Sequence, residues 1–420
     1  MTKLTRRDLL KEAAIAAAAS PMIVPRSVFG TEEKAAPSER VTVAHIGVGG
    51  MGMGDLGAVL ACKEAQTVAV ADPYQDRRDA AAAVANAKGY ADFRKLFDQE
   101  KVDAVVIATP DHWHVPAAIY AGKRGIHAYV QKPLGLTIEQ DLTIAKLFKE
   151  NNLLFQYGTQ QRSIPHCYRG CELVRRGAIG KIQSIEVTAP NGSAGGSTQE
   201  VPVPATLDYD LWLGPAPKAP YTVDRCVNPG HFFINDYSIG YLAGWGSHPL
   251  DIMVWGSDAD LSGPITVEGT GLIPTDGLYN NVMNWEMNIM LGDTPLSFKT
   301  GGDMTKFHGE DGRWIDVRRG SLAANDPAIL DSFDESAPSI LQPSRSVNHE
   351  ADFILAIKEG KRAVTTLEES VRSDIISHLC DIAVRTNSKV SWDPLKFEFI
   401  SVPDAGRKMV SRPIRAPWTL

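Results

Sequence analysis

The chain has 420 residues, of which 44% are hydrophobic and 22% charged, and its formal net charge is −7 at pH 7. These values are ordinary for a globular protein, so they exclude a coiled coil, a collagen-like repeat and long-range disorder. An acidic chain offers no basic surface for nucleic acid, and its five cysteines lack the C-x-x-C spacing of a zinc site and are too few for a disulfide scaffold.

Residues 1–30 have the layout of an export signal. A basic start containing Arg6-Arg7 is followed by an alanine-rich run over 13–19. The arginine pair indicates the twin-arginine route and predicts a periplasmic or other extracytoplasmic location; the alternative is an amphipathic N-terminal helix. Residues 31–39 form a polar linker. Beyond it no run reaches the roughly 18 apolar residues that a bilayer-spanning helix needs, so we expect no membrane partner for the mature form.

Residues 40–160 are predicted to form a dinucleotide-binding domain. An apolar strand over 41–46 leads into a G-x-G-x-x-G loop, and a helix over 53–62 and a strand over 67–71 follow. This order of elements is typical of a loop that binds a dinucleotide pyrophosphate at a helix N-terminus. The loop residues expected to bind the cofactor are Gly47, Val48, Gly49, Gly50, Met51 and Gly52.

The choice between NAD and NADP depends on the residues after the second strand. Asp72 lies 20 residues beyond Gly52, where a carboxylate accepts hydrogen bonds from the adenosine ribose. The same carboxylate repels a 2′-phosphate, so the sequence favours NAD. Arg77 and Arg78 follow closely and leave NADP open as the alternative.

Further apolar strands, separated by helices, predict a parallel sheet with helices on both faces. The strands fit residues 103–108, 126–130 and 153–157. Ligands bind at the carboxyl ends of such strands. The residues expected to contact the cofactor there are Thr109, Pro110, His114, Gln131 and Lys132. His112 and His114 lack a third clustered ligand, so no metal is predicted.

Three segments in this order are specific enough to indicate a family: Ala-Thr-Pro-Asp-His-Trp-His over 108–114, Gln-Lys-Pro over 131–133 and Gly-Trp-Gly-Ser-His-Pro-Leu-Asp over 244–251. With them the chain resembles the Gfo/Idh/MocA oxidoreductases from about residue 41 to the C-terminus. The resemblance implies an N-terminal Rossmann domain and a C-terminal α+β domain, whose large, mostly antiparallel sheet carries helices on one face. It also implies NAD(P), a sugar or polyol substrate and a homo-oligomer.

The resemblance makes Lys132 and His248 the predicted catalytic pair. A lysine at the end of a strand can hydrogen-bond the reacting hydroxyl, and a histidine suits proton transfer near neutral pH. Two positions depart from the family pattern. Gln131 replaces the usual Glu, and Gly244 replaces an Asp four residues before the histidine. His248 is therefore expected to act with Lys132 alone or with a residue from elsewhere.

Residues 161–420 are predicted to form the second domain, which shapes the substrate site. Alternating apolar residues over 283–291 indicate a half-buried antiparallel strand. Sugar hydroxyls need polar partners, and sugar CH faces stack on aromatic rings. The residues expected to contact the substrate are Arg162, His166, Tyr237, Trp245 and Asp251. Core packing remains an alternative for each aromatic residue, and a charge at a helix start for Asp251.

The export signal bears on the reaction, because free NAD is scarce outside the cytoplasm. We therefore expect a sugar or polyol oxidoreductase that keeps its NAD(H) bound through turnover. The alternative is an NAD-dependent glycoside hydrolase that oxidises C3 transiently and eliminates the glycosidic oxygen, with Tyr237 or Tyr241 as a candidate base. A second alternative is a sugar-binding protein without catalysis, to which the departures at Gln131 and Gly244 point.

Overall fold

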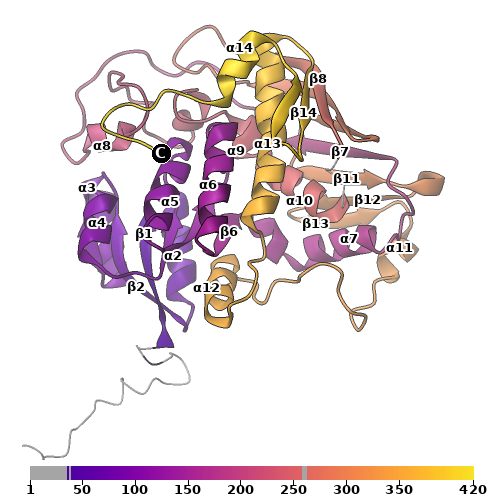
Figure 1. The fold of residues 1–420 in the computed structure, drawn as a ribbon, viewed down its shortest axis with the longest axis horizontal. Helices are drawn as coiled ribbons and strands as arrows, with labels where there is room; N and C mark the ends of the chain where they lie inside the picture. The colour runs from indigo at the N-terminus through magenta and orange to yellow at the C-terminus, as the bar shows by residue number, and fades with distance from the viewer. Residues whose placement is uncertain (1–35, 37–38, 258–262) are drawn as a thin grey trace, which may run out of the picture. The chain divides into compact units, whose positions relative to one another are not determined.

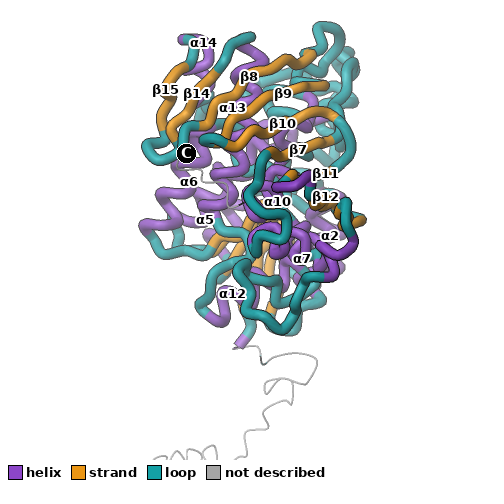
Figure 2. The backbone as a smooth tube through the Cα atoms, turned by 90° about the vertical axis from the view of Figure 1, so that its right-hand side faces the viewer, coloured by secondary structure: helices purple, strands orange, loops and turns teal. Residues whose placement is uncertain are grey.

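Two β-sheets, each built from one part of the chain, organise the fold (Figures 1 and 2). The computed structural model describes residue 36, residues 39–257 and residues 263–420. The expected export signal over 1–30 and most of the linker over 31–39 lie outside the described residues. Among the helices that are described, none is both long and apolar enough to cross a bilayer.

The first sheet has six parallel strands in the order β3-β2-β1-β4-β5-β6. This order reverses direction between β1 and β4, which is where ligands bind in doubly wound folds. The strands are β1 (Val41–Ile46), β2 (Ala65–Ala71), β3 (Lys88–Tyr90), β4 (Ala104–Ile107), β5 (His127–Gln131) and β6 (Phe155–Gly158). The predicted Rossmann fold is confirmed.

Helices connect these strands because each crossover must return the chain to the same end of a parallel sheet. They are α2 (Gly50–Leu60), α3 (Gln75–Ala85), α4 (Phe93–Gln99), η3 (Asp111–Trp113), α5 (His114–Gly122) and α6 (Ile138–Glu150). The helix after the glycine loop was expected from residue 53, but α2 begins at Gly50, inside the motif. The motif is thus both a turn and a helix N-terminus.

The second sheet has nine strands in the order β13-β12-β11-β7-β10-β9-β8-β14-β15, and only the β7–β10 pair is parallel. The strands are β7 (Ser184–Ala189), β8 (Ile265–Leu272), β9 (Asn284–Leu291), β10 (Thr294–Thr300), β11 (Met304–His308), β12 (Trp314–Arg318), β13 (Ser321–Ala324), β14 (Val390–Asp393) and β15 (Glu398–Ser401). Exposed and buried residues alternate along β9, because only one face packs on helices. The expected sheet is confirmed.

The remaining helices lie outside the first sheet's crossovers, and some of them cover the buried face of the second sheet. They are η4 (Gln160–Ser163), α7 (Pro165–Arg175), α8 (Tyr209–Leu213), η5 (Gly230–Phe233), α9 (Tyr241–Gly244), α10 (Ser247–Ser257), η6 (Glu310–Gly312), α11 (Pro327–Asp331), α12 (His349–Glu359), α13 (Leu367–Thr386), α14 (Asp404–Arg407) and η7 (Lys408–Val410). Helices α7, α10 and α13 pack on the second sheet, while α12 returns to α2 and β1. Figure 1 shows α13 beside α6, between the two sheets.

Candidate active site

The glycine loop after β1 has the geometry of a pyrophosphate cradle. Gly47 has a φ of +81°, and a Cβ there would lie 2.7 Å from the Ala108 carbonyl. A Cβ at Gly52 would lie 2.0 Å from the Gly47 carbonyl oxygen. Gly49 precedes α2 without a side-chain cap, so the first amides of the helix are left for an anionic ligand. These residues fit a dinucleotide.

Asp72 lies where the ribose prediction requires it, directly after β2. Its two carboxylate oxygens accept hydrogen bonds from the backbone N–H of Val48, at 2.9 Å, and of Tyr74, at 2.8 Å. Burial raises the pKa of Asp72, and these amides together with Arg77 and Arg78 oppose the rise. Each oxygen keeps a second lone pair for a ribose hydroxyl. The ribose contact stays a prediction.

A cleft of about 460 Å³ opens above the glycine loop and is covered by a distant part of the chain. We call residues 206–237 the strap. Backbone hydrogen bonds fasten both of its ends to the first domain: Gln75 N–H to the Thr206 carbonyl, at 2.7 Å, and His112 N–H to the Tyr237 carbonyl, at 3.1 Å. Besides the glycine loop, the lining includes Asp72, Thr109, Pro110, Trp212, His231, Phe232 and Trp418. A dinucleotide in this cleft would lie between the glycine loop and the strap of the same chain.

Lys132 follows β5 and is held near the cleft by a buried histidine. The His114 ring spans two loops, with Nδ1 2.6 Å from the Pro133 carbonyl and Nε2 2.9 Å from the Thr109 carbonyl. Burial lowers the pKa of His114 to about 4, and the contacts of its two nitrogens with carbonyl oxygens oppose that shift. Both nitrogens thus face backbone, and the structure gives His114 a structural role in place of the predicted cofactor contact.

Gln131 contacts the helix that follows the glycine loop, and its predicted cofactor contact stays a prediction. Its amide nitrogen lies 3.1 Å from each carboxylate oxygen of Asp55 in α2. The neutral amide leaves Lys132 without an adjacent charge in the sequence. Burial lowers the pKa of Lys132, while the carboxylates of Asp111 and Asp55 oppose that shift. A lysine with a lowered pKa can exchange a proton near neutral pH.

His248, the second residue of α10, shares this site with Lys132. Its side chain is buried, and Nδ1 has no hydrogen-bond partner among the described residues. Burial and the charges of Lys132 and Arg319 lower the pKa of His248 well below its usual value. The imidazole is therefore neutral at pH 7 and suits hydrogen bonding to a substrate hydroxyl.

Aromatic rings extend from Lys132 to His248. The Lys132 Nζ lies 5.5 Å from the centre of the Phe232 ring. Tyr241 links Phe232 to Trp245, with centroid distances of 5.9 and 6.2 Å, and Trp245 lies 5.9 Å from the His248 ring. Trp245 is partly exposed, so its predicted role as a stacking surface for a sugar remains a prediction that the geometry allows.

Several buried polar atoms around these rings have no partner within the described part of the chain. They are Asp111 Oδ2, Gln161 Oε1, Ser247 Oγ, His248 Nδ1 and Asp303 Oδ1. Gln161 donates to the other Asp303 oxygen at 2.9 Å, and Arg319 lies 3.5 Å from that same oxygen. Because buried polar groups are nearly always paired, these atoms are free to hydrogen-bond a polar ligand or water.

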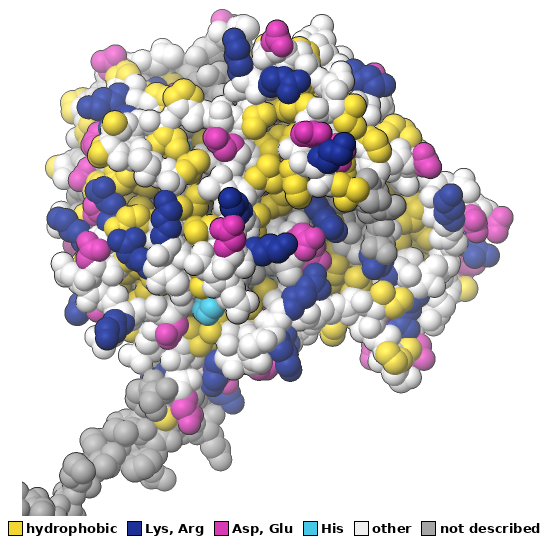
Figure 3. Space-filling model, in the orientation of Figure 1, with side chains coloured by type: hydrophobic (Ala, Val, Ile, Leu, Met, Phe, Trp, Pro, Cys, Tyr) yellow, Lys and Arg dark blue, Asp and Glu magenta, His cyan; other side chains and the backbone are white. Residues whose placement is uncertain are grey.

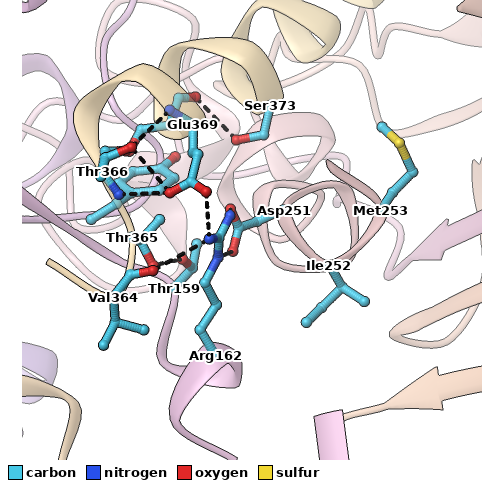
Figure 4. A network of polar contacts seen from close by, with 12 residues as sticks. Thr159, Arg162, Asp251, Ile252, Met253, Val364, Thr365, Thr366, Glu369 and Ser373 are labelled. Atoms are coloured by element: carbon cyan, nitrogen blue, oxygen red, sulfur yellow. Dashed lines mark hydrogen bonds and ion pairs between the residues drawn. The ribbon is translucent and has the colours of Figure 1, made fainter. Parts of the chain in front are cut away.

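Arg162 and Asp251 were expected to contact the substrate, but they contact each other. Arg162 Nη2 lies 2.6 Å from Asp251 Oδ1, and both side chains are fully buried. Glu369 of α13 adds a second carboxylate 3.1 Å from Arg162 Nη1. Figure 4 shows the guanidinium between these two acids. The charges satisfy one another inside the protein, so both residues position α10 and do not reach a ligand.

Tyr237 and His166 also have protein partners in place of the expected substrate. The Tyr237 hydroxyl accepts a hydrogen bond from Arg225 at 2.9 Å inside the strap, and the ring is fully buried. His166 lies 3.0 Å from the Arg318 carbonyl, beside the β12–β13 turn. This turn carries Arg319, whose guanidinium lies 5.3 Å from the Trp245 ring.

Asp111, Phe232 and Arg319 are the site residues that sequence reasoning missed. Asp111 stands in the noted segment over 108–114, so its position after β4 was a usable signal. Phe232 and Arg319 come from the strap and a hairpin turn, and no motif marks either. Their role depends on tertiary contacts alone.

A second groove, of about 1080 Å³, lies away from this site. It runs between α6 and α13 and is lined mainly by apolar side chains, including Phe148, Leu367, Trp392 and Phe397. Figure 3 shows hydrophobic side chains gathered on this face over α6 and α13. None of the glycine-loop residues or Lys132 lines it, so it is separate from the candidate active site.

The parallel sheet, the glycine cradle and the lysine beside it define an NAD-binding Rossmann-fold protein of the oxidoreductase class. Residues 41–159 match the model of the Gfo/Idh/MocA "Oxidoreductase family, NAD-binding Rossmann fold", and residues 191–420 match the C-terminal alpha/beta domain of the same family. The chain therefore belongs to the Gfo/Idh/MocA oxidoreductase family.

Curated relatives resemble parts of the chain. A levoglucosan dehydrogenase of Pseudarthrobacter phenanthrenivorans is 32% identical over 98 residues, which are 23% of this chain and 25% of the relative. A glycosyl hydrolase family 109 protein 2 of Shewanella sp. (strain ANA-3) is 30% identical over 213 residues, 43% of this chain and 45% of the relative. The matched regions thus span a quarter to less than half of these relatives.

Solved structures share the fold over most of the chain. A levoglucosan dehydrogenase in complex with NADH and levoglucosan aligns with a TM-score of 0.64 and 18% identity, covering 84% of this chain and 99% of that one. A myo-inositol 2-dehydrogenase of Lactobacillus plantarum aligns with a TM-score of 0.59 and 15% identity, covering 84% and 99%. At this identity the likeness concerns the fold.

Proposed function

We propose that the protein is an NAD(H)-dependent oxidoreductase that acts on a CH–OH group of a sugar or polyol. The observation that carries the proposal is the shared site of Lys132 and His248 beside the glycine cleft, with aromatic rings and unpartnered polar atoms around it. Aromatic faces and hydroxyl-binding groups together suit a carbohydrate. The solved neighbour with NADH and levoglucosan supports the same substrate class.

Each of these residues has a separate role in oxidising a secondary alcohol. NAD, when bound, accepts the hydride. Lys132 hydrogen-bonds the reacting hydroxyl and, as a neutral amine, takes its proton. His248 remains neutral because burial and the Arg319 charge oppose its protonation, so it orients the hydroxyl by hydrogen bonding. Trp245 provides a face for the carbohydrate ring.

Retention of the cofactor through turnover is part of the proposal. The strap closes over the cleft and is fastened to the β2–α3 and β4–α5 connections by backbone hydrogen bonds. Trp418, from the C-terminus, packs edge-on against Trp113 at a centroid distance of 4.8 Å. Release of a dinucleotide would require these contacts to open, which supports slow exchange.

The glycoside hydrolase reading is the second candidate function. Its specific support is the 30% identity with a family 109 glycosyl hydrolase, over a longer stretch than the match to the dehydrogenase. Of the two tyrosines considered as its base, Tyr237 is buried against Arg225, whereas Tyr241 is partly exposed beside Phe232 and Trp245. If the protein is a glycoside hydrolase, Tyr241 is therefore the candidate base.

One set of measurements separates the candidates. Denaturing the purified full chain and analysing the supernatant by mass spectrometry identifies the bound nucleotide. The protein is then offered a panel of sugars and polyols, and nicotinamide absorbance is followed; aryl glycosides are tested for aglycone release without added NAD. Absorbance change without aglycone release supports the oxidoreductase. Aglycone release supports the hydrolase, and neither signal with no bound nucleotide indicates a sugar-binding protein.

We also propose that the protein is exported by the twin-arginine route and assembles as a homo-oligomer. The export proposal rests on Arg6-Arg7 and the apolar run after them. Replacing both arginines by lysine should retain the protein in the cytoplasm, as measured by cell fractionation. Light scattering of the mature protein measures its molar mass in solution and so tests whether it is an oligomer.

A further inference from the structure

Two carboxylates and one imidazole meet inside the protein between α6 and α13, apart from the candidate active site. Asp141 comes from α6, and Asp374 and His378 come from α13, where their spacing of four residues places them on the same side of the helix. Each side chain is at most 5% exposed, and each offers one ligand atom, all within 4.8 Å of one another. Figure 1 shows the two helices side by side. None of the three residues lines the glycine cleft or the second groove.

The distances between these groups are close to those in a metal centre. His378 Nε2 lies 3.2 Å from Asp141 Oδ2 and 3.7 Å from Asp374 Oδ2. A tetrahedral Zn²⁺ ion, with bonds of about 2.0–2.2 Å, holds its donor atoms about 3.3–3.5 Å apart. An ion placed between the three side chains would therefore contact all of them with little movement of the helices.

The hydrogen bonding of this cluster is incomplete. Both Asp141 oxygens and His378 Nε2 lack a hydrogen-bond partner among the described residues. The 3.2 Å contact between the two side chains therefore does not have the geometry of a hydrogen bond. Asp141 is fully buried, and a buried carboxylate without hydrogen bonds is costly. Its lone pairs thus point to a partner other than the described side chains and backbone.

The charge of the cluster favours a cation as that partner. In the part of the chain that the structure describes, no lysine or arginine forms an ion pair with Asp141 or Asp374, and His378 is their one cationic neighbour. With both carboxylates ionised, the cluster is negative even when the imidazole is protonated, and burial makes such a charge costly. A divalent cation would cancel the charge, and carboxylate and imidazole donors suit Zn²⁺.

Neighbouring groups hold Asp374 in the manner of a metal ligand. Its Oδ1 accepts a hydrogen bond from the Tyr157 hydroxyl at 3.0 Å, and its Oδ2 accepts one from the Leu134 N–H at 3.1 Å. Carboxylates that bind metals are commonly oriented by such outer hydrogen bonds. Leu134 lies two residues after Lys132, so the cluster is connected to the loop that carries the predicted catalytic lysine.

We propose that Asp141, Asp374 and His378 bind one divalent transition-metal ion, with Zn²⁺ as the ion that fits these donors. The imidazole Nε2 and one oxygen of each carboxylate supply the ligands. The ion has a structural role: it ties α6 to α13 and, through the hydrogen bond that Asp374 accepts from Leu134, fixes the loop after β5. The proposal does not depend on the reaction that the protein catalyses.

The metal content of the purified full chain tests the site directly. After expression with added Zn²⁺ and passage over a chelating resin to remove loosely bound ions, elemental mass spectrometry should find about one Zn²⁺ per wild-type chain. Asp141→Asn and His378→Gln should each lose the ion. The matched control is His308→Gln, which alters a partly exposed histidine 3.0 Å from Glu186 and should keep the ion. A wild-type chain without Zn²⁺, or cluster variants that hold as much as the wild type, overturns the proposal.

Two measurements on the wild-type chain cover the case that the cluster variants do not fold. In crystals of the full chain grown with Zn²⁺, anomalous scattering at the zinc edge should place the ion about 2.0–2.2 Å from the three donor atoms. Removal of the ion with a chelator, verified by elemental mass spectrometry, should lower the melting temperature by roughly 5 °C, and added Zn²⁺ should restore it. Anomalous density only at other positions, or an unchanged melting temperature after removal, indicates a buried ion pair without metal and overturns the proposal.

Discussion

The Arg162 guanidinium and the Asp251 carboxylate form a two-point ion pair inside the protein, with nitrogen–oxygen distances of 2.7 and 2.6 Å. Asp251 lies three residues after His248 on α10, so the pair fixes the helix that carries the predicted catalytic histidine. Figure 4 shows that Glu369 of α13 reaches the same guanidinium. An internal charge cluster thus positions the site without contacting it.

Removal of one member of this pair should destabilise the fold. Asp251→Asn leaves the Arg162 charge only partly compensated, and we expect a loss of about 3–5 kcal/mol in the free energy of unfolding. Urea denaturation measures it. The control is Arg372→Ala, which breaks an exposed 3.3 Å pair with Glu368 and should cost about 0.5 kcal/mol or less. Similar losses in the two variants would contradict the assigned role.

Because of Glu369, the free energy of unfolding should depend on pH in the acid range. Burial would raise its pKa, but the charges of Arg162 and Arg362 outweigh that effect and lower the pKa to about 2. A lowered pKa means that the carboxylate stabilises the folded state fully above pH 4.5, and that this contribution disappears as the pH falls towards 2. The difference in unfolding free energy between wild type and Glu369→Gln should therefore shrink across this range. For Glu368→Gln, the exposed neighbour, it should stay near zero; a constant difference for Glu369→Gln would refute the linkage.

A substitution in the glycine loop can test cofactor binding without changing the stability of the fold. A Cβ at Gly49 meets nothing closer than 3.6 Å, the distance to Arg77 Nη1, but it would project beside the expected pyrophosphate. Gly49→Ala should therefore lose bound nucleotide while its melting temperature without nucleotide stays unchanged. Gly54→Ala on the same helix, with open space around it, should gain about 1 kcal/mol from helix propensity and keep the nucleotide. Equal nucleotide content in the two variants would argue against the cradle.

Replacement of Lys132 should reduce turnover without releasing the bound nucleotide. Lys132→Ala removes the amine that holds the reacting hydroxyl, and we expect turnover to fall by about 10²-fold or more, with the nucleotide still bound. The bound nucleotide is quantified after denaturation. Loss of nucleotide with turnover preserved would contradict the assignment.

The C-terminal tryptophan should control how fast the cofactor leaves. Trp418 packs on Trp113 and under the Arg94 guanidinium, 4.2 Å away, at the edge of the cleft. Trp418→Ala should speed nucleotide release several-fold in a chase with unlabelled NAD, because one side of the enclosure is lost. Phe397→Ala, an exposed aromatic side chain in the second groove, should not change that rate. If both variants release nucleotide as slowly as the wild type, Trp418 does not limit exit.

The local pattern of apolar residues and glycines in the sequence determined several elements of the fold. The strand, glycine loop and helix over 41–60, the alternation along β9 and the lysine after β5 follow from hydrophobic period and turn chemistry, which neighbouring residues decide among themselves. Those signals gave the fold class and the predicted cofactor loop, whereas the predicted Lys132–His248 pair came from the resemblance to the family.

The polar contacts were decided by tertiary structure. Arg162, Asp251 and Tyr237 looked like substrate residues because polar side chains near strand ends and motifs often are. Their partners lie 12 to 207 residues away in the chain, and no local pattern encodes which buried charge meets which. The same holds for Asp111 and Arg319: a group enters the site only when strand order, the strap and the β12–β13 turn bring it there, because burial and electrostatic pairing depend on distance in space.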